Sequence, residues 1–207
     1  RWKASFPSHG KVVFTTHSNG ACCSDLDSGT PLPLNTWTHV VMTHDGAKDI
    51  IYFNGVQVNE KNVAGALDAT THPLGIGYDP IDNANYFNGG LDDVQLFDVA
   101  LNAGQVAALY AAQSVAPSVP QGKVAEYVFG NNGADDTDFG NHADVSNSTF
   151  TTDRFGFGKS ALLCNGQYSE AFASNASQLN SDVTTISFWV KVNSLPGNGE
   201  AFLLSYG

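Results

Sequence analysis

An Asn-Gly pair at residues 54–55 is the feature that most constrains the fold of this chain. The apolar residues 50–53 precede it, and the alternating residues 56–58 follow it. Both central residues of a type I′ turn need positive φ, which Asn and Gly adopt at little cost. The pair therefore predicts a tight antiparallel β-hairpin at this point.

The same alternation of apolar and polar residues recurs along the chain, interrupted by Gly, Asn, Asp and Pro about every 8–12 residues. Further strand candidates lie at residues 12–16, 37–44, 94–97, 124–129, 161–164 and 185–192. Residues 1–6 and 201–206 also resemble strands. Many short strands with frequent turns predict an all-β protein, an antiparallel β-sandwich.

We expect one short helix and one linker within this β-rich pattern. Asn102 is a helix cap with Gln105 as its capping-box partner, and an apolar stripe follows at Val106, Leu109 and Tyr110. Residues 113–121 (QSVAPSVPQ) are small and polar, with two prolines and no periodicity. This composition is typical of a linker.

The charge balance excludes some partners. The 207 residues include 20 acidic and 9 basic side chains, for a net charge of −11, which repels nucleic acid and anionic membranes. Of the acidic residues, 16 are Asp, which agrees with calcium binding or with simple solubility. No apolar run reaches 18 residues, so we expect no membrane insertion. The composition is typical of a protein that works outside the cell or at its surface.

Three cysteines, Cys22, Cys23 and Cys164, are the disulfide candidates. A bond between the adjacent Cys22 and Cys23 and a bond from Cys164 to one of them are both compatible with the sequence. No Cys/His pattern has the spacing of a structural zinc site, so none is expected.

The sequence predicts no catalytic residues and therefore no enzyme. The four glutamates are scattered, and no nucleophile elbow, zinc-protease or phosphate-loop motif occurs. His39 and His44 differ by an odd number along one strand, so they should point to opposite faces and play structural roles.

Taken together, the motifs resemble those of the laminin-G-like, concanavalin A-like jelly rolls. The segments that resemble the second half of that fold are residues 35–41, 51–55 and 87–94. Those that resemble its first half are residues 126–129, 157–162 and 186–191. The resemblance covers nearly the whole chain. It divides the chain into a C-terminal half-sandwich (1–112), a linker (113–121) and an N-terminal half-sandwich (122–207), which together equal one sandwich.

The two halves stand in the reverse of the family's order. Three alternatives follow: a circular permutant, a unit of a tandem repeat with an arbitrary cut, or subunits that exchange halves. In each alternative, Arg1 and Trp2 meet Tyr206 and Gly207. We predict that this meeting point is the assembly junction. The partners that we expect are therefore copies of the chain itself, joined head to tail or in tandem.

The resemblance also implies a structural Ca²⁺. Carried over residue by residue, its ligands are Asp138, Gly140, Asn141, and Asp92 or Asp93. These are the hard oxygen donors that calcium prefers. A solvated turn at residues 135–138 is the alternative.

Glycans are the second ligand that the resemblance implies. Tyr78, Asp82, Asn83 and Tyr86 lie in one expected loop and are the binding candidates, because loops carry recognition. Trp37 and Trp189 are expected to be structural. The motifs NST and NAS make Asn147 and Asn175 candidate glycosylation sites.

The leading hypothesis is a non-enzymatic extracellular structural protein, a unit of a fibre, surface layer or adhesin stalk. The alternative is a lectin-like, carbohydrate-binding module of a larger secreted enzyme or adhesin.

Overall fold

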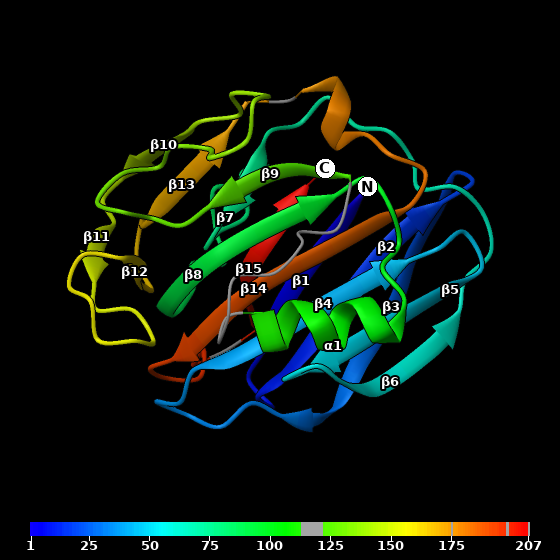
Figure 1. The fold of residues 1–207 in the computed structure, drawn as a ribbon. Coiled ribbons are helices and arrows are strands. Elements are labelled where there is room, and N and C mark those ends of the chain that lie inside the picture. The colour runs from blue at the N-terminus through cyan, green and yellow to red at the C-terminus, as the bar shows by residue number, and fades with distance from the viewer. Residues whose placement is uncertain (113–121, 175, 198, 207) are drawn as a thin grey trace.

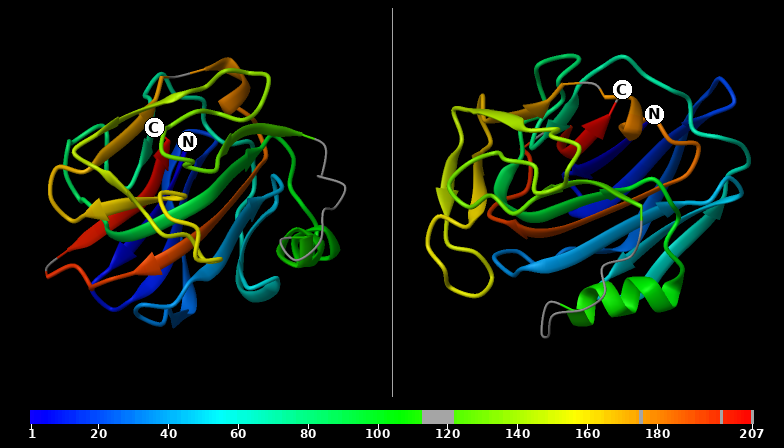
Figure 2. Two further views of the ribbon diagram at one scale, coloured as in Figure 1. Left: turned by 60° about the vertical axis from the view of Figure 1, so that its left-hand side comes forward. Right: turned by 45° about the horizontal axis from the view of Figure 1, so that its top comes forward.

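The computed structural model describes residues 1–112, 122–174, 176–197 and 199–206, and in these residues the chain forms two stacked antiparallel β-sheets (Figures 1 and 2). The first sheet has the order β10 (Ala143–Ser146), β13 (Glu170–Ala173), β7 (Leu74–Ile76), β15 (Glu200–Tyr206), β1 (Trp2–Pro7), β2 (Lys11–Ser18), β3 (Ala21–Pro31). The second has the order β11 (Thr149–Thr151), β12 (Ala161–Asn165), β8 (Asn88–Phe97), β14 (Thr184–Val192), β4 (Thr38–His44), β5 (Lys48–Phe53), β6 (Val56–Asn62), with β9 (Lys123–Tyr127) also paired to β8. The expected β-sandwich is confirmed.

The core lies between the sheets and follows from the alternation of side chains along each strand. In β14, Ile186, Phe188 and Val190 belong to the main buried cluster, whereas Ser187 and Trp189 alternate with them and point away from it. Trp189 is nevertheless 9% exposed, because other aromatic side chains pack on that outer face. Its expected structural role agrees with this burial.

Strands from the two ends of the chain pair with each other. β1 and β15 are antiparallel neighbours, with Trp2 opposite Tyr206, and their ring centroids lie 6.1 Å apart. The residues of the predicted junction that the structure describes thus meet within one chain. Gly207 lies outside the described residues.

The helix α1 (Ala103–Ala112) begins as the sequence predicts, with the short 3₁₀ turn η1 (Ser177–Leu179) as the other helical element described. The side-chain oxygens of Asn102 and Gln105 each accept a hydrogen bond from the other residue's backbone N–H, at 3.0 and 2.9 Å. Val106 and Leu109 pack on the outer face of the second sheet, against Val41 and other apolar residues. This capping box therefore positions the helix on the sheet (Figure 1).

The Asn54-Gly55 hairpin is also confirmed. Phe53 pairs with Val56, and the two turn residues have φ of 50° and 78°. His39 and His44 lie on opposite faces of β4, as expected from the alternation. His44 belongs to the core side, where its Nδ1 lies 2.7 Å from Asp49 Oδ1.

Candidate functional site

Three tyrosines form a stack that runs from the core to the surface. The rings of Tyr78 and Tyr86 are nearly parallel, at 4°, with centroids 6.0 Å apart, and Tyr168 is tilted against Tyr86 at 5.5 Å. Tyr78 is buried, whereas Tyr168 is 68% exposed. Burial raises the pKa of Tyr78 to about 12, so its phenol is uncharged at neutral pH. We call these three residues the tyrosine stack.

The loop that carries Tyr86 is held in one conformation by its own polar groups. The backbone groups of Asp79 and Ala84 bond to each other, and the Asp79 carboxylate accepts the N–H of Ile81 at 2.9 Å. The Tyr86 hydroxyl lies 2.9 Å from both the backbone and side-chain oxygens of Asn83. A side chain fixed in this way loses little entropy when it contacts a ligand.

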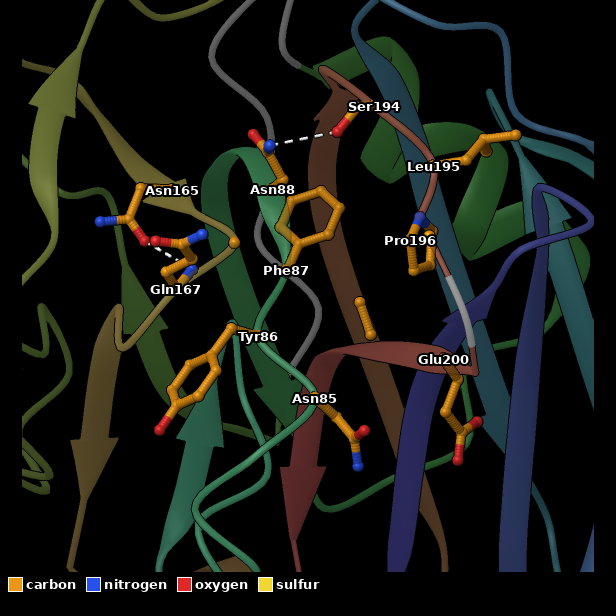
Figure 3. A pocket seen from close by; sticks show the side chains of 13 residues that line it. Asn85, Tyr86, Phe87, Asn88, Asn165, Gln167, Ser194, Leu195, Pro196 and Glu200 are labelled. Atoms are coloured by element: carbon orange, nitrogen blue, oxygen red, sulfur yellow. Dashed lines mark hydrogen bonds between the residues drawn. The ribbon is translucent and has the colours of Figure 1, made fainter.

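A cleft of about 410 Å³ opens beside the tyrosine stack. Three segments line it, at residues 85–88, at residues 165–167 and at residues 194–197 with 200–201, and Figure 3 shows their side chains around a common opening. Its polar side chains are those of Asn85, Tyr86, Asn88, Asn165, Gln167, Ser194 and Glu200. The cleft therefore offers mostly uncharged hydrogen-bonding groups.

Some of these polar groups are already paired, and others are free. Asn88 Nδ2 donates to Ser194 Oγ at 3.1 Å, and Asn165 Oδ1 accepts the backbone N–H of Gln167 at 2.7 Å. Within the described part of the chain, the side-chain amides of Asn85 and Gln167 make no hydrogen bond. They can donate to and accept from a ligand.

The described lining residues of this cleft are poorly suited to acid–base catalysis. Glu200 is the one carboxylate among its described lining residues, and it lies 3.2 Å from Lys3 Nζ. Hydrolysis of a glycosidic bond needs two carboxyl groups that flank the bond. Stacking and hydrogen bonding are the chemistry that the cleft can provide.

The structure separates the four residues that the sequence proposed for glycan binding. Tyr86 lines the cleft, but Tyr78 is buried beneath it, and Asn83 supports the Tyr86 hydroxyl. Asp82 is exposed and does not line the cleft. These residues remain candidates for glycan binding, and Tyr86 is the one of the four that lines the cleft.

Sequence reasoning missed Tyr168 and the amides at residues 165–167. Tyr168 has φ of 56°, an unusual value for a bulky side chain and one often found at functional sites. The signal was the turn sequence NGQY, where an Asn-Gly pair is followed by Gln and then by an aromatic residue. Its link to residue 86 depends on the pairing of β7 with β13, which no local pattern reveals.

The expected calcium ligands at Asp92 and Asp93 bind an arginine instead. Arg154 Nη1 lies 2.8 Å from Asp92 Oδ2, and Nη2 lies 2.5 Å from Asp93 Oδ2. The guanidinium also lies over the rings of Phe155 and Trp189, at 4.3 and 4.8 Å. Burial, followed by the charge of Asp93, raises the pKa of Asp92 to about 7 despite Arg154. An arginine thus holds the place assigned to a metal ion.

The remaining calcium candidates either form hydrogen bonds within the protein or lie at the surface. Asn141 accepts a hydrogen bond from Gln178 and donates one to the carbonyl of Val124. Asp138 and Gly140 are exposed, and Asp135 organises their loop by accepting backbone hydrogen bonds. The described side chains therefore do not fit one calcium site made of the proposed ligands.

The structure distributes the remaining candidates as follows. Cys22 and Cys23 form a disulfide, and Cys164 is a buried free thiol whose pKa burial raises to about 12. Asn147 is exposed in the turn between β10 and β11. Asn175 lies outside the described residues.

Comparison with known proteins connects the chain to a family. Comparison with curated proteins and with solved structures gave no significant match. Among the described residues, no helix is long and apolar enough to cross a membrane. Residues 1–107 match the laminin G family model described as the concanavalin A-like lectin/glucanases superfamily, whose laminin-G-like domains are generally binding domains. With about half of the chain matched, and with a sandwich of two antiparallel sheets, this protein belongs to the concanavalin A-like lectin/glucanase superfamily.

Proposed function

We propose that this domain binds glycans in the cleft beside the tyrosine stack. The observation that carries the proposal is the position of Tyr86, which lines a cleft rich in amides and packs against the 68% exposed ring of Tyr168. A sugar ring presents an apolar face and a rim of hydroxyl groups. The apolar face stacks on the tyrosine ring, and the hydroxyl groups form hydrogen bonds with the amides of Asn85 and Gln167.

The proposed ligand is a neutral oligosaccharide. Tyr86 and the amide side chains carry no charge, and the charged groups beside the cleft, Glu200 and Lys3, are paired with each other. The net charge of −11 opposes the approach of sulfated or uronic glycans. With Glu200 as its one carboxylate among the described lining residues, the cleft is suited to recognition without hydrolysis.

The proposed location is outside the cell or at its surface, where such glycans are displayed. The domain would act there as the recognition module of a larger secreted protein.

We prefer glycan binding to the role in a fibre, surface layer or adhesin stalk. That role needs a contact between copies, and the obvious candidate is the junction of β1 and β15. Because Trp2 and Tyr206 pair within one chain, the junction offers no open sheet edge to a neighbouring copy. The fibre hypothesis predicts self-association in solution, which sedimentation velocity would detect.

Glycan-array screening followed by titration calorimetry tests the proposal. We expect Tyr168→Ala to weaken binding of the best glycan by about fivefold, since aromatic contacts are worth about 1 kcal/mol and 1.4 kcal/mol is tenfold. Phe157→Ala is the matched control, because Phe157 is 66% exposed but belongs neither to the tyrosine stack nor to the cleft lining. Binding to no glycan, or equal losses in both variants, would contradict the proposal.

A further inference from the structure

A β-bulge in the β2–β3 hairpin places two cysteines opposite one histidine. In the pairing of β2 with β3, Thr16 faces Ser24 and Ser18 faces Ala21. His17 is therefore the single residue opposite both Cys22 and Cys23. A bulge of this kind re-aims side chains that would otherwise alternate between the faces of the sheet. Cys23 takes up the extra residue with φ of 68°.

His17 lies close to both cysteine sulfurs, which the disulfide joins to each other in this structure. Their potential ligand atoms all lie within 4.8 Å of one another, and Cys23 Sγ lies 3.9 Å from His17 Nε2. A tetrahedral ion held at about 2.3 Å from sulfur and about 2.1 Å from nitrogen sets these two atoms roughly 3.6 Å apart. In the described part of the chain, this is the one group of three such side chains that comes this close.

The surroundings leave these ligands accessible. Both cysteines are exposed, and His17 is half-buried. Cys164 is fully buried in the core, so it does not compete for metal.

We propose that the β2–β3 hairpin, once its disulfide is reduced, binds a zinc-class ion through Cys22, Cys23 and His17. The disulfide accepts two electrons from two monothiol molecules, which leave joined as their own disulfide, and the hairpin gains two thiols. Binding of the ion releases the two thiol protons to solvent. Two thiolates and one imidazole leave the fourth position to water, and sulfur ligands favour zinc over calcium or magnesium. The site is therefore available in the reduced protein and closed in the oxidised one.

Cobalt titration of the intact protein tests this proposal, because tetrahedral Co²⁺ bound to thiolates gives intense visible and near-ultraviolet bands. We expect the anaerobically reduced protein to develop these bands at one Co²⁺ per chain and to lose them when Zn²⁺ is added. The oxidised protein should not develop them. Cys164→Ser should behave as wild type, and Cys22→Ser and Cys23→Ser should each abolish the two-thiolate spectrum.

His17→Ala separates a built site from a simple pair of thiols. Loss of outer-shell groups costs metal sites about 10–100-fold in affinity, so loss of a direct ligand should weaken cobalt binding by at least about tenfold. His9→Ala is the matched control, because His9 is exposed in the preceding turn and lies outside the cluster. Circular dichroism confirms that each variant is folded. The proposal is overturned by an absence of saturable bands in the reduced protein, or by equal cobalt affinity in His17→Ala and wild type.

Discussion

Arg154 supplies from within the chain the positive charge that the sequence assigned to calcium. Its guanidinium bridges two neighbouring carboxylates that are largely withdrawn from water, at 3% and 21% side-chain exposure for Asp92 and Asp93. Planar guanidinium groups suit such two-pronged pairing. The Asp pair was a sound signal of a cation, but the cation comes from residue 154, about 60 positions away, and no local pattern indicates it.

Replacement of Arg154 should turn this ion pair into a calcium-dependent site. We expect Arg154→Gln to lower the free energy of unfolding by about 3–5 kcal/mol, because two buried carboxylates lose their partner. Calcium should restore part of this loss and should leave wild-type stability unchanged. Urea denaturation with calcium and with chelator measures both effects.

Lys48→Gln is the control for this comparison, because Lys48 pairs with Glu60 on an exposed face. It should change stability little. Wild-type stability that falls with chelator, or an Arg154→Gln variant as stable as Lys48→Gln, would contradict the account.

His44 is a second buried residue whose charge depends on the groups that surround it. Its Nδ1 lies 2.7 Å from Asp49 Oδ1, and its Nε2 lies 2.8 Å from the carbonyl of Gly65. Both ring nitrogens thus face acceptors, which favours the doubly protonated ring. Burial lowers the pKa of His44, but these hydrogen bonds outweigh it and raise the pKa above the usual value.

This raised pKa predicts a loss of stability at alkaline pH. The unfolded histidine titrates near pH 6.5, so the contribution is fully present below about pH 6.5 and is lost as pH rises through the higher folded pKa. Thermal melts between pH 6 and pH 9 should show this decline in wild type and a smaller one in His44→Gln. His39 does not add to it, since burial lowers its pKa to about 3. Identical pH profiles for the two proteins would rule out the proposed role.

At the scale of elements, the sequence predicted best where turn chemistry or capping is local. The Asn54-Gly55 hairpin and the Asn102–Gln105 capping box were both found as expected. The short strands β7, β10, β11 and β13 were missed because they are only three or four residues long. The 11-residue β3 was missed because its sequence, ACCSDLDSGTP, shows no regular alternation of apolar and polar residues. The bulge at residues 22–23 was also missed, since it depends on which residues of β2 lie opposite.

The capping box can be tested by one pair of substitutions. We expect Asn102→Ala to destabilise the protein by about 1 kcal/mol, because the backbone N–H of Gln105 loses its acceptor. Asn102→Ser should retain most of the stability, as serine is also a good cap. Chemical denaturation measures the difference, and equal stability of the alanine and serine variants would argue against a stabilising cap.

At the scale of the whole molecule, the composition and alternation were enough to predict the sandwich but not its binding surface. Residues 86 and 168 meet because β7 lies beside β13 in the first sheet. Residues 194–197, which precede β15, and residues 200–201 at its start complete the cleft. Three segments distant in sequence therefore form one site, which is why the loop candidates at residues 78–86 covered only part of it.

The central claim is that glycans bind in the cleft beside the tyrosine stack. NMR titration of the ¹⁵N-labelled protein with the best glycan from the array tests it most directly. The side-chain amide signals of Asn85, Asn88, Asn165 and Gln167 report on the cleft itself. Our account predicts saturable shifts of these signals, with a several-fold higher glycan concentration needed for saturation in Tyr168→Ala. Saturable shifts that leave these amides unmoved and appear elsewhere, such as around Arg154 and Phe155, would contradict it.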